Sequence, residues 1–234
     1  MVRCRMLRHD DAMPDNLTRL VVVRHGETDW NTETRIQGHT DIPLNARGRW
    51  QAERVGQALA DEGIHAIYSS DLQRARDTAA AIARHAGLPL HVDPALRERH
   101  FGCLEGRTQA EVAEHHPEDM RRWRAREPGY GPAGGETLQA FYDRTVGAAA
   151  RLAALHPGQT IALIAHGGVL DCFYRAANRV AIEAPRSWKV TNASINRLLY
   201  SPEGFSLVGW ADDRHLDEDG LDETTDGLVL RSVG

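Results

Sequence analysis

Two histidines in this sequence each follow an apolar run that is typical of a buried strand, and each is followed by a glycine. The run Leu20–Val23 leads to His25, and the run Ile161–Ala165 leads to His166. In an open α/β sheet, ligands bind beyond the carboxyl ends of the strands. If the two strands are parallel neighbours in one sheet, both imidazoles lie in the same crevice. This coincidence of position favours a functional site over two unrelated structural histidines.

Two arginines indicate what that crevice would bind. Arg24 precedes His25, and Arg74 falls in the first turn of a helix that we expect to begin near Asp71, which stands in the N-cap position. A helix N-terminus and a guanidinium group both present N–H donors to an oxyanion. Two arginines together with two histidines disfavour a metal cation and favour a phosphate group.

Six sequence blocks around these residues resemble those of a known family. In chain order they are RHGETDWN at residues 24–31, RIQGHTDIPLNARG at 35–48, SSDLQRARDTA at 69–79, LRERHFGCLEG at 96–106, GGETLQAFYDR at 134–144 and AHGG at 165–168. They resemble the histidine phosphatase superfamily, specifically its phosphoglycerate mutase-like branch, over about residues 19–210. A bare RHG triplet is a weak signal, whereas six ordered blocks are specific.

The resemblance implies a role for each matching residue. His25 would be the nucleophile that becomes phosphohistidine, because a neutral imidazole can attack phosphorus and nearby arginines lower its pKa. Arg24, Arg74 and His166 would bind the equatorial phosphoryl oxygens, where charge is spread in the transition state. Glu98 matches the general acid that protonates the leaving oxygen and later activates water. The resemblance implies no metal ion and no cofactor.

Four further residues belong to the expected substrate site. Asn31 would donate a hydrogen bond to the phosphoryl group. Gln37 and Gly38 match a loop that lines the substrate side of the pocket in this family. Gly167 follows His166 directly and is included with it.

Two groups of residues near the site are open to two interpretations. Residues 99–101, Arg-His-Phe, follow the catalytic glutamate and either face the substrate or pack inside the protein. A basic cluster on a predicted short helix is either a solvated helix surface or a contact for a second acidic group of the substrate. Its members are Arg121, Arg122, Arg124 and Arg126.

The elements that must position these residues alternate between strands and helices. Residues 95–135 are expected to form short helices and loops. Alternating strands and helices imply a mostly parallel sheet that is covered on both faces, so the fold class is α/β, a three-layer α/β/α sandwich. We expect strands at Leu20–Val23, His65–Ser69, Leu90–Val92 and Ile161–Ala165. Helices are expected over Arg47–Ala60, from about Asp71 to Ala86 and from Leu138 to Leu152. A strand pair is expected at Asn192–Tyr200 and Phe205–Trp210.

Length and composition agree with one large α/β domain. The chain has 234 residues, of which 41% are hydrophobic and 26% are charged. We expect an N-terminal extension over residues 1–18, the phosphatase domain over 19–210 and an acidic, mobile C-terminal tail over 211–234. The net charge of −5 argues against a nucleic-acid binder, so any anion site must be local.

Cysteine content and hydropathy bear on the location of the protein. Three widely spaced cysteines form neither a disulfide framework nor a metal-binding pair. No run approaches the roughly 18 apolar residues of a membrane span, and the first residues lack the apolar core of a signal peptide. We therefore expect a soluble, reduced, cytoplasmic protein that acts on a small phosphorylated substrate and not at a membrane. The oligomeric state is open, and a homodimer is compatible with the sequence.

Four functions are compatible with some of these features. We favour a metal-free phosphomonoesterase that works through phosphohistidine, with a 2,3-bisphosphoglycerate-dependent phosphoglycerate mutase as the alternative. True mutases of the family carry a lysine where this chain has Gln109, an asparagine where it has Gly168, and a longer insert than residues 106–135. A non-catalytic phosphate sensor would not need Glu98. A dinuclear metal phosphatase would need a carboxylate cluster beside the histidines.

Overall fold

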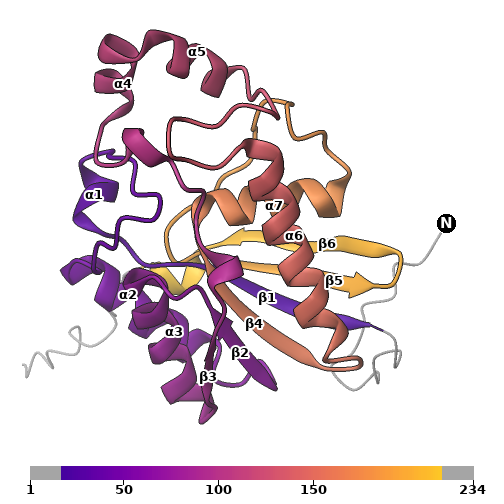
Figure 1. Ribbon diagram of the computed structural model, residues 1–234. Coiled ribbons are helices and arrows are strands. Elements are labelled where there is room, and N and C mark those ends of the chain that lie inside the picture. The colour runs from indigo at the N-terminus through magenta and orange to yellow at the C-terminus, as the bar shows by residue number, and fades with distance from the viewer. Residues whose placement is uncertain (1–16, 218–234) are drawn as a thin grey trace, which may run out of the picture.

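The computed structural model describes residues 17–217, which contain one six-stranded sheet. The strand order is β3-β2-β4-β1-β5-β6 (Figure 1). All the strands expected from the sequence are present. Their bounds are β1 Thr18–Arg24, β2 Ala66–Ser69, β3 Leu90–Val92, β4 Thr160–Ala165, β5 Ile195–Ser201 and β6 Gly204–Asp212.

The sheet is parallel through four strands and antiparallel at one edge. The strands β3, β2, β4 and β1 run parallel, and β5 pairs antiparallel with both β1 and β6. In the pairing of β1 with β4, Arg24 lies opposite Ala165, so the two strands end at the same level. The predicted mostly parallel sheet, and the predicted neighbourhood of the two histidine-bearing strands, are confirmed.

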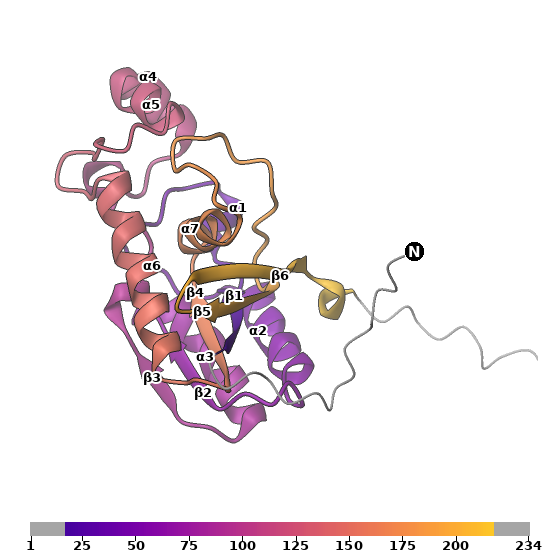
Figure 2. The same cartoon turned by 90° about the vertical axis from the view of Figure 1, so that its right-hand side faces the viewer.

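Helices cover both faces of the sheet, as the alternation of side chains along β1 requires. Leu20 and Val22 point into one core cluster, which contains residues of α6 and α7. Val21 and Val23 point into the other cluster, which contains residues of α2 and α3. Successive side chains of a strand face opposite sides of the sheet, so a fully apolar strand needs a helical layer on each side. Figure 2 shows these two layers, and the α/β/α sandwich is confirmed.

The helices follow the sequence prediction with two additions. The short helix α1 and the helix α7 are not predicted by the sequence. The helices α2, α3 and α6 fall where the apolar periodicity indicates, and α4 and α5 lie in the segment 95–135, where we expect short helices. Their bounds are α1 Asp29–Thr32, α2 Ala46–Ala58, α3 Gln73–Ala86, α4 Gln109–His115, α5 Pro117–Arg124, α6 Leu138–Ala154 and α7 Gly167–Asn178, with 3-10 turns at Pro94–Leu96, Gly102–Leu104 and Arg214–Leu216.

The prediction that Asp71 caps α3 is wrong. The N-cap residue is Leu72, which makes no side-chain capping hydrogen bond. Asp71 instead accepts a hydrogen bond from Arg97 Nε at 2.6 Å, and a second one from the same guanidinium group. The carboxylate therefore ties the start of α3 to the segment that carries Glu98.

The fold extends beyond residue 210, where we expected the acidic tail to begin. Strand β6 continues to Asp212, and the 3-10 turn at Arg214–Leu216 packs against α2, where Arg54 Nε donates to the carbonyl of His215 at 2.8 Å. The remainder of the expected tail and nearly all of the expected N-terminal extension lie outside the described residues. Within residues 17–217, no helix is long and apolar enough to cross a membrane.

Candidate active site

His25 and His166 lie side by side at the carboxyl ends of β1 and β4. The backbone N–H of His25 donates to the carbonyl of Ala165 at 2.9 Å, which extends the pairing of the two strands by one residue. The two imidazole rings are 5.2 Å apart between centroids, and the residues are 3% and 0% exposed. The structure thus places the two imidazoles next to each other at the ends of neighbouring strands, as expected from the sequence.

A hydrogen bond to the backbone fixes the tautomer of His25. Its Nδ1 lies 2.6 Å from the carbonyl oxygen of Gly26, which can only accept, so Nδ1 carries the proton. The lone pair therefore resides on Nε2. Burial, and then the positive charges of Arg74 and Arg24, lower the pKa of His25 well below 6.5. The imidazole stays neutral near pH 7, which is the state that a nucleophile requires.

His166 has the opposite tautomer. Its Nδ1 accepts a hydrogen bond from Arg74 Nε at 3.2 Å, so the proton resides on Nε2. That Nε2 is buried and has no hydrogen-bond partner among the described residues. Burial, followed by the charge of Arg74, lowers the pKa of His166 well below 6.5. A neutral N–H donor without a partner beside the nucleophile is suited to bind an oxyanion.

Arg74 is held rigidly in the second position of α3. Besides the bond to His166, it donates to the carbonyl of Gly38 at 2.8 Å and to that of Thr40 at 3.0 Å. These bonds use three of the five N–H groups of a guanidinium and leave two for a ligand. Gly38 has a φ of +54°, and a Cβ there would lie 2.1 Å from Glu105 Oε1, so the loop needs glycine. Burial lowers the pKa of Arg74 to about 10, and Glu98 opposes that shift.

Arg24 lies on the other side of His25. Its Nη1 donates to the carbonyl of Val190 at 2.6 Å, while its Nε is buried with no partner among the described residues. Burial lowers the pKa of Arg24 to about 10, so the group remains a cation near neutral pH. A Cβ on Gly167 would lie 3.4 Å from this Nε. Gly167 therefore packs against Arg24 and does not line the cavity that Arg24, His25 and Arg74 enclose.

Asn31 presents its amide N–H₂ group because its oxygen is already engaged. The oxygen accepts from the backbone N–H of Thr28 at 3.0 Å and from the amide of Asn192 at 3.2 Å. The first of these bonds belongs to the capping box of α1, which orients the side chain. Sequence reasoning missed Asn192, which also donates to the carbonyl of His25 at 3.0 Å.

Glu98 lies at the N-terminus of α7. Its Oε2 accepts from the backbone N–H of Gly168 at 2.8 Å, and its Oε1 accepts from the N–H of Arg99 at 2.8 Å. A Cβ on Gly168 would lie only 2.2 Å from Oε1. The glycine therefore creates the space in which the carboxylate sits, and its own N–H group, in the first turn of α7, donates to that carboxylate.

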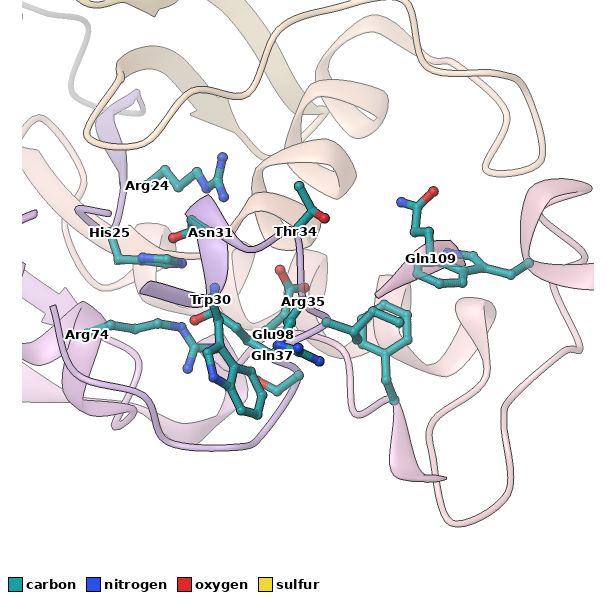
Figure 3. Close-up of a pocket in the computed structure, with 14 residues that line it drawn as sticks. Arg24, His25, Trp30, Asn31, Thr34, Arg35, Gln37, Arg74, Glu98 and Gln109 are labelled. Atoms are coloured by element: carbon teal, nitrogen blue, oxygen red, sulfur yellow. The ribbon is translucent and has the colours of Figure 1, made fainter. Parts of the chain in front are cut away.

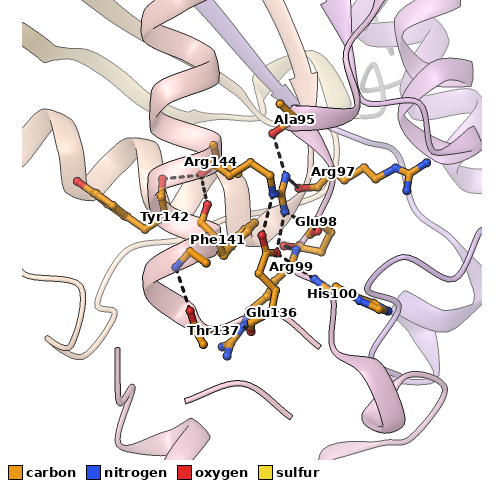
Figure 4. Close-up of polar contacts among 12 residues, drawn as sticks. Ala95, Arg97, Glu98, Arg99, His100, Glu136, Thr137, Phe141, Tyr142 and Arg144 are labelled. Carbon is orange, nitrogen blue, oxygen red and sulfur yellow. Dashed lines mark hydrogen bonds and ion pairs between the residues drawn. The ribbon is translucent and has the colours of Figure 1, made fainter. Parts of the chain in front are cut away.

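The backbone around Glu98 is held by a second set of polar contacts (Figure 4). Arg144 of α6 donates to the carbonyls of Ala95, Arg97 and Glu98 at 2.9, 3.1 and 3.2 Å. Both carboxylate oxygens of Glu136 accept from the same guanidinium at 2.8 Å. The sequence places Arg144 at the end of one family block, but gives no sign that it contacts the segment carrying Glu98.

These residues surround a cavity of about 310 Å³. Figure 3 shows Arg24, His25 and Arg74 along one side of it, with Glu98 across from them. His166 does not line this cavity, but it contacts Arg74, which does. Within residues 17–217, no group of three or more histidine, cysteine, aspartate or glutamate residues could hold a metal ion. The expected site residues that line the cavity are Arg24, His25, Asn31, Gln37, Gly38, Arg74 and Glu98.

The predicted basic cluster divides into two pairs, and its last member, Arg126, lies beyond the end of α5. Arg121 and Arg122 form ion pairs with Glu118 and Glu127, and neither lines the cavity. Their positive charges are thus neutralised on the helix surface. Arg124 and Arg126 line a second cavity that adjoins the first.

Known proteins resemble this chain in both sequence and fold. The sequence pattern of the histidine phosphatase superfamily (branch 1) matches residues 20–213. Phosphoglycerate mutase-like protein 4 of Arabidopsis thaliana is 39% identical over 90% of this chain and 92% of its own length. The metal-independent phosphoserine phosphatase of the same plant is 36% identical over 91% and 89%. A mycobacterial glucosyl-3-phosphoglycerate phosphatase structure, 32% identical, superimposes with a TM-score of 0.75 over 83% of this chain and 99% of that one. The chain belongs to the histidine phosphatase superfamily.

Proposed function

We propose that this histidine phosphatase hydrolyses phosphomonoesters of small metabolites through a phosphohistidine on His25. The observation that carries this proposal is the pair of opposite tautomers. The lone pair of His25 Nε2 is free for attack, while His166 Nε2–H is free to donate. The two functions that a phosphoryl transfer site needs, a nucleophile and an oxyanion donor, are thus adjacent and neutral.

In the first step, His25 Nε2 attacks phosphorus in line with the leaving oxygen. Arg24, Arg74 and His166 donate to the three equatorial oxygens, and the Asn31 amide adds a further donor. Glu98 in its protonated form gives its proton to the leaving alcohol as the P–O bond breaks. The products of this step are the free alcohol and a phosphoryl group on His25 Nε2.

In the second step, water replaces the alcohol beside Glu98. The carboxylate takes a proton from that water, whose oxygen attacks phosphorus and displaces His25 Nε2. Inorganic phosphate leaves and the imidazole returns to its neutral state. No step requires a metal ion, because the guanidinium groups supply the positive charge.

Hydrolysis is favoured over mutase chemistry by the charges around the cavity. A mutase must retain a bisphosphorylated intermediate, which requires additional cations for its second phosphate and its carboxylate. Arg121 and Arg122, the candidates for that role, are already paired with carboxylates. Gln109 lines the cavity at the position where the family's mutases carry lysine.

The decisive experiment measures phosphate release from a panel of esters by the purified protein, with and without a chelator and with and without 2,3-bisphosphoglycerate. We expect phosphate release that a chelator does not reduce and that bisphosphoglycerate does not stimulate. Interconversion of 3- and 2-phosphoglycerate that is faster than phosphate release would instead identify a mutase. Activity lost to the chelator and restored by a divalent metal would reject the mechanism.

A further inference from the structure

A second cavity, of about 470 Å³, adjoins the first. The two share four lining residues, which are Glu98, Phe101, Gln109 and Trp123. Glu98 therefore stands at their junction. Because Glu98 must reach the leaving oxygen, the phosphoryl group occupies the first cavity and the rest of the alcohol extends toward the second.

One part of this second cavity is apolar. The rings of Phe101 and Trp123 pack against each other with centroids 5.1 Å apart. Met120, Leu138 and Phe141 complete the apolar lining. Such a surface stabilises the carbon skeleton of a leaving group by removing apolar area from water.

The other part carries positive charge that the protein does not neutralise. Arg124 and Arg186 line the cavity, are exposed, and form no hydrogen bond or ion pair with the residues that the structure describes. The guanidinium group of Arg99 is buried and, among the described residues, donates to two backbone carbonyls, those of Glu136 and Tyr130, at 3.0 and 2.6 Å. The cavity thus contains three arginines without a carboxylate partner.

The acidic groups of this cavity do not cancel that charge. Asp171 Oδ2 accepts from Arg126 at 2.8 Å and from Arg175 at 3.0 Å, so two cations share one carboxylate, whose Oδ1 is buried and has no hydrogen-bond partner among the described residues. Glu98 is held by the N-terminus of α7. The positive charge of Arg186 also extends to the phosphoryl site, where it helps, after burial, to lower the pKa of Arg24. An anionic leaving group would complement this excess of positive charge.

We propose that the second cavity is a leaving-group subsite for a carboxylate, and that the enzyme selects phosphomonoesters whose alcohol joins the ester oxygen to a carboxylate through an apolar spacer. Arg186 and Arg124 bind the carboxylate, and the Phe101–Trp123 pair contacts the spacer. This inference rests on the proposed phosphatase function.

The test compares two aryl esters that differ by one carboxylate. Phenyl phosphate and 4-(phosphonooxy)phenylacetate release phenols of nearly equal acidity, because the methylene group insulates the ring from the carboxylate. The demand on Glu98 is therefore the same for both. We expect kcat/KM of the wild-type protein to be roughly tenfold or more higher for the carboxylate ester, as a charge-assisted contact would give.

Variants of Arg186 and Arg124 test whether these two residues cause the preference for the carboxylate ester. Arg186→Gln and Arg124→Gln should each lower the ratio of the two kcat/KM values several-fold, and the double variant should bring it near one. Hydrolysis of phenyl phosphate by these variants shows that they fold. Arg121→Gln is the matched control, because Arg121 lies on the same helix as Arg124 and is paired outside the cavity; it should retain the wild-type ratio.

Two results would overturn the proposal while leaving the phosphatase function intact. The first is a wild-type ratio near one with both esters hydrolysed. The second is a preference for the carboxylate ester that Arg186→Gln and Arg124→Gln leave unchanged. Failure to hydrolyse any ester in the panel would instead reject the proposed function, and this inference with it.

Discussion

The carboxylate of Glu98 occupies the space that a side chain at Gly168 would fill. Glu98 Oε2 accepts from the backbone N–H of Gly168 at 2.8 Å, and a Cβ on that residue would lie 2.2 Å from Oε1 and 3.1 Å from the Phe141 ring. The residue two positions after His166 thus decides where the general acid sits. Because Gly168 is the last residue of the sequence His-Gly-Gly, this sequence pattern affects the position of the group that transfers the proton.

Gly168→Ala should therefore impair the acid without disturbing the helix, since alanine is a better helix former than glycine. The added methyl group displaces the Glu98 carboxylate, and a displacement of about 1 Å can cost on the order of a hundredfold in rate. We expect kcat to fall roughly tenfold to a hundredfold, with little change in the melting temperature, because the gain in helix propensity offsets the close contact with the Phe141 ring. Steady-state kinetics and thermal unfolding check this together. An alanine variant with wild-type kcat would show that the carboxylate can function elsewhere.

Glu98→Gln should lower activity most for substrates whose leaving group must be protonated as it departs. Alkyl phosphates, whose alkoxide is a poor leaving group, should lose about a hundredfold or more in kcat/KM. Esters such as p-nitrophenyl phosphate, whose leaving group needs no proton, should lose much less in the phosphorylation step. The measurement is kcat/KM across a series of leaving groups. Equal losses along the series would remove Glu98 from the acid role.

Arg144 should act as a positioning residue for the same carboxylate. Arg144→Gln removes the bonds to the Ala95, Arg97 and Glu98 carbonyls, so kcat should fall about tenfold, more for poor leaving groups. In the double variant with Glu98→Gln, the two losses should not add, because both act through one group. Arg151→Gln on the same helix is the control, as Arg151 pairs with Asp93 at the surface. Additive losses would assign Arg144 a purely structural role.

Much of the site could be predicted because its residues follow elements with strong local signals. The apolar runs of β1 and β4 are short, fully buried and stopped by glycine, so the positions of His25 and His166 at strand ends could be inferred from the sequence alone. The helix that carries Arg74 shows a clear apolar face. These signals are local, and a parallel pairing then brings the histidines together.

The features of the site that the sequence does not predict depend on contacts between segments that are far apart in the chain. Helix α7 begins with two glycines and has no side-chain cap, so its start resembles a loop in the sequence. In place of a capping side chain, the carboxylate of Glu98 accepts a hydrogen bond from the N–H of Gly168 in the first turn. Asp71 occupies a cap-like position but pairs with Arg97, 26 residues later. No periodicity indicates that Asn192 reaches Asn31 or that Arg186 reaches the second cavity, because both residues lie in the irregular segment between α7 and β5.

The neutral histidines should make stability depend on pH. Burial, followed by the charge of Arg74, holds the pKa of both His25 and His166 well below 6.5 in the folded state. The unfolded chain takes up protons at these residues below about pH 6.5 and the folded chain does not, so the free energy of unfolding falls as pH falls. From pH 7.5 to 5.5, each histidine contributes a loss of about 1.4 kcal/mol.

His166→Asn should remove the contribution of His166 to the pH dependence of the free energy of unfolding. Urea unfolding at the two pH values should show a loss of stability about 1.4 kcal/mol smaller for the variant than for the wild type. Equal losses in the two proteins would mean that His166 already binds a proton in the folded state.

The central claim is the covalent intermediate on His25, and trapping it is the most direct test. The wild-type protein is mixed with a ³²P-labelled monoester, quenched within one turnover in alkaline detergent, and mapped by mass spectrometry. We predict label on His25 that is stable to base and lost in acid, and no label and no turnover in a folded His25→Ala variant. Turnover by His25→Ala at a rate near that of the wild type, or wild-type turnover without label on His25, would contradict the mechanism.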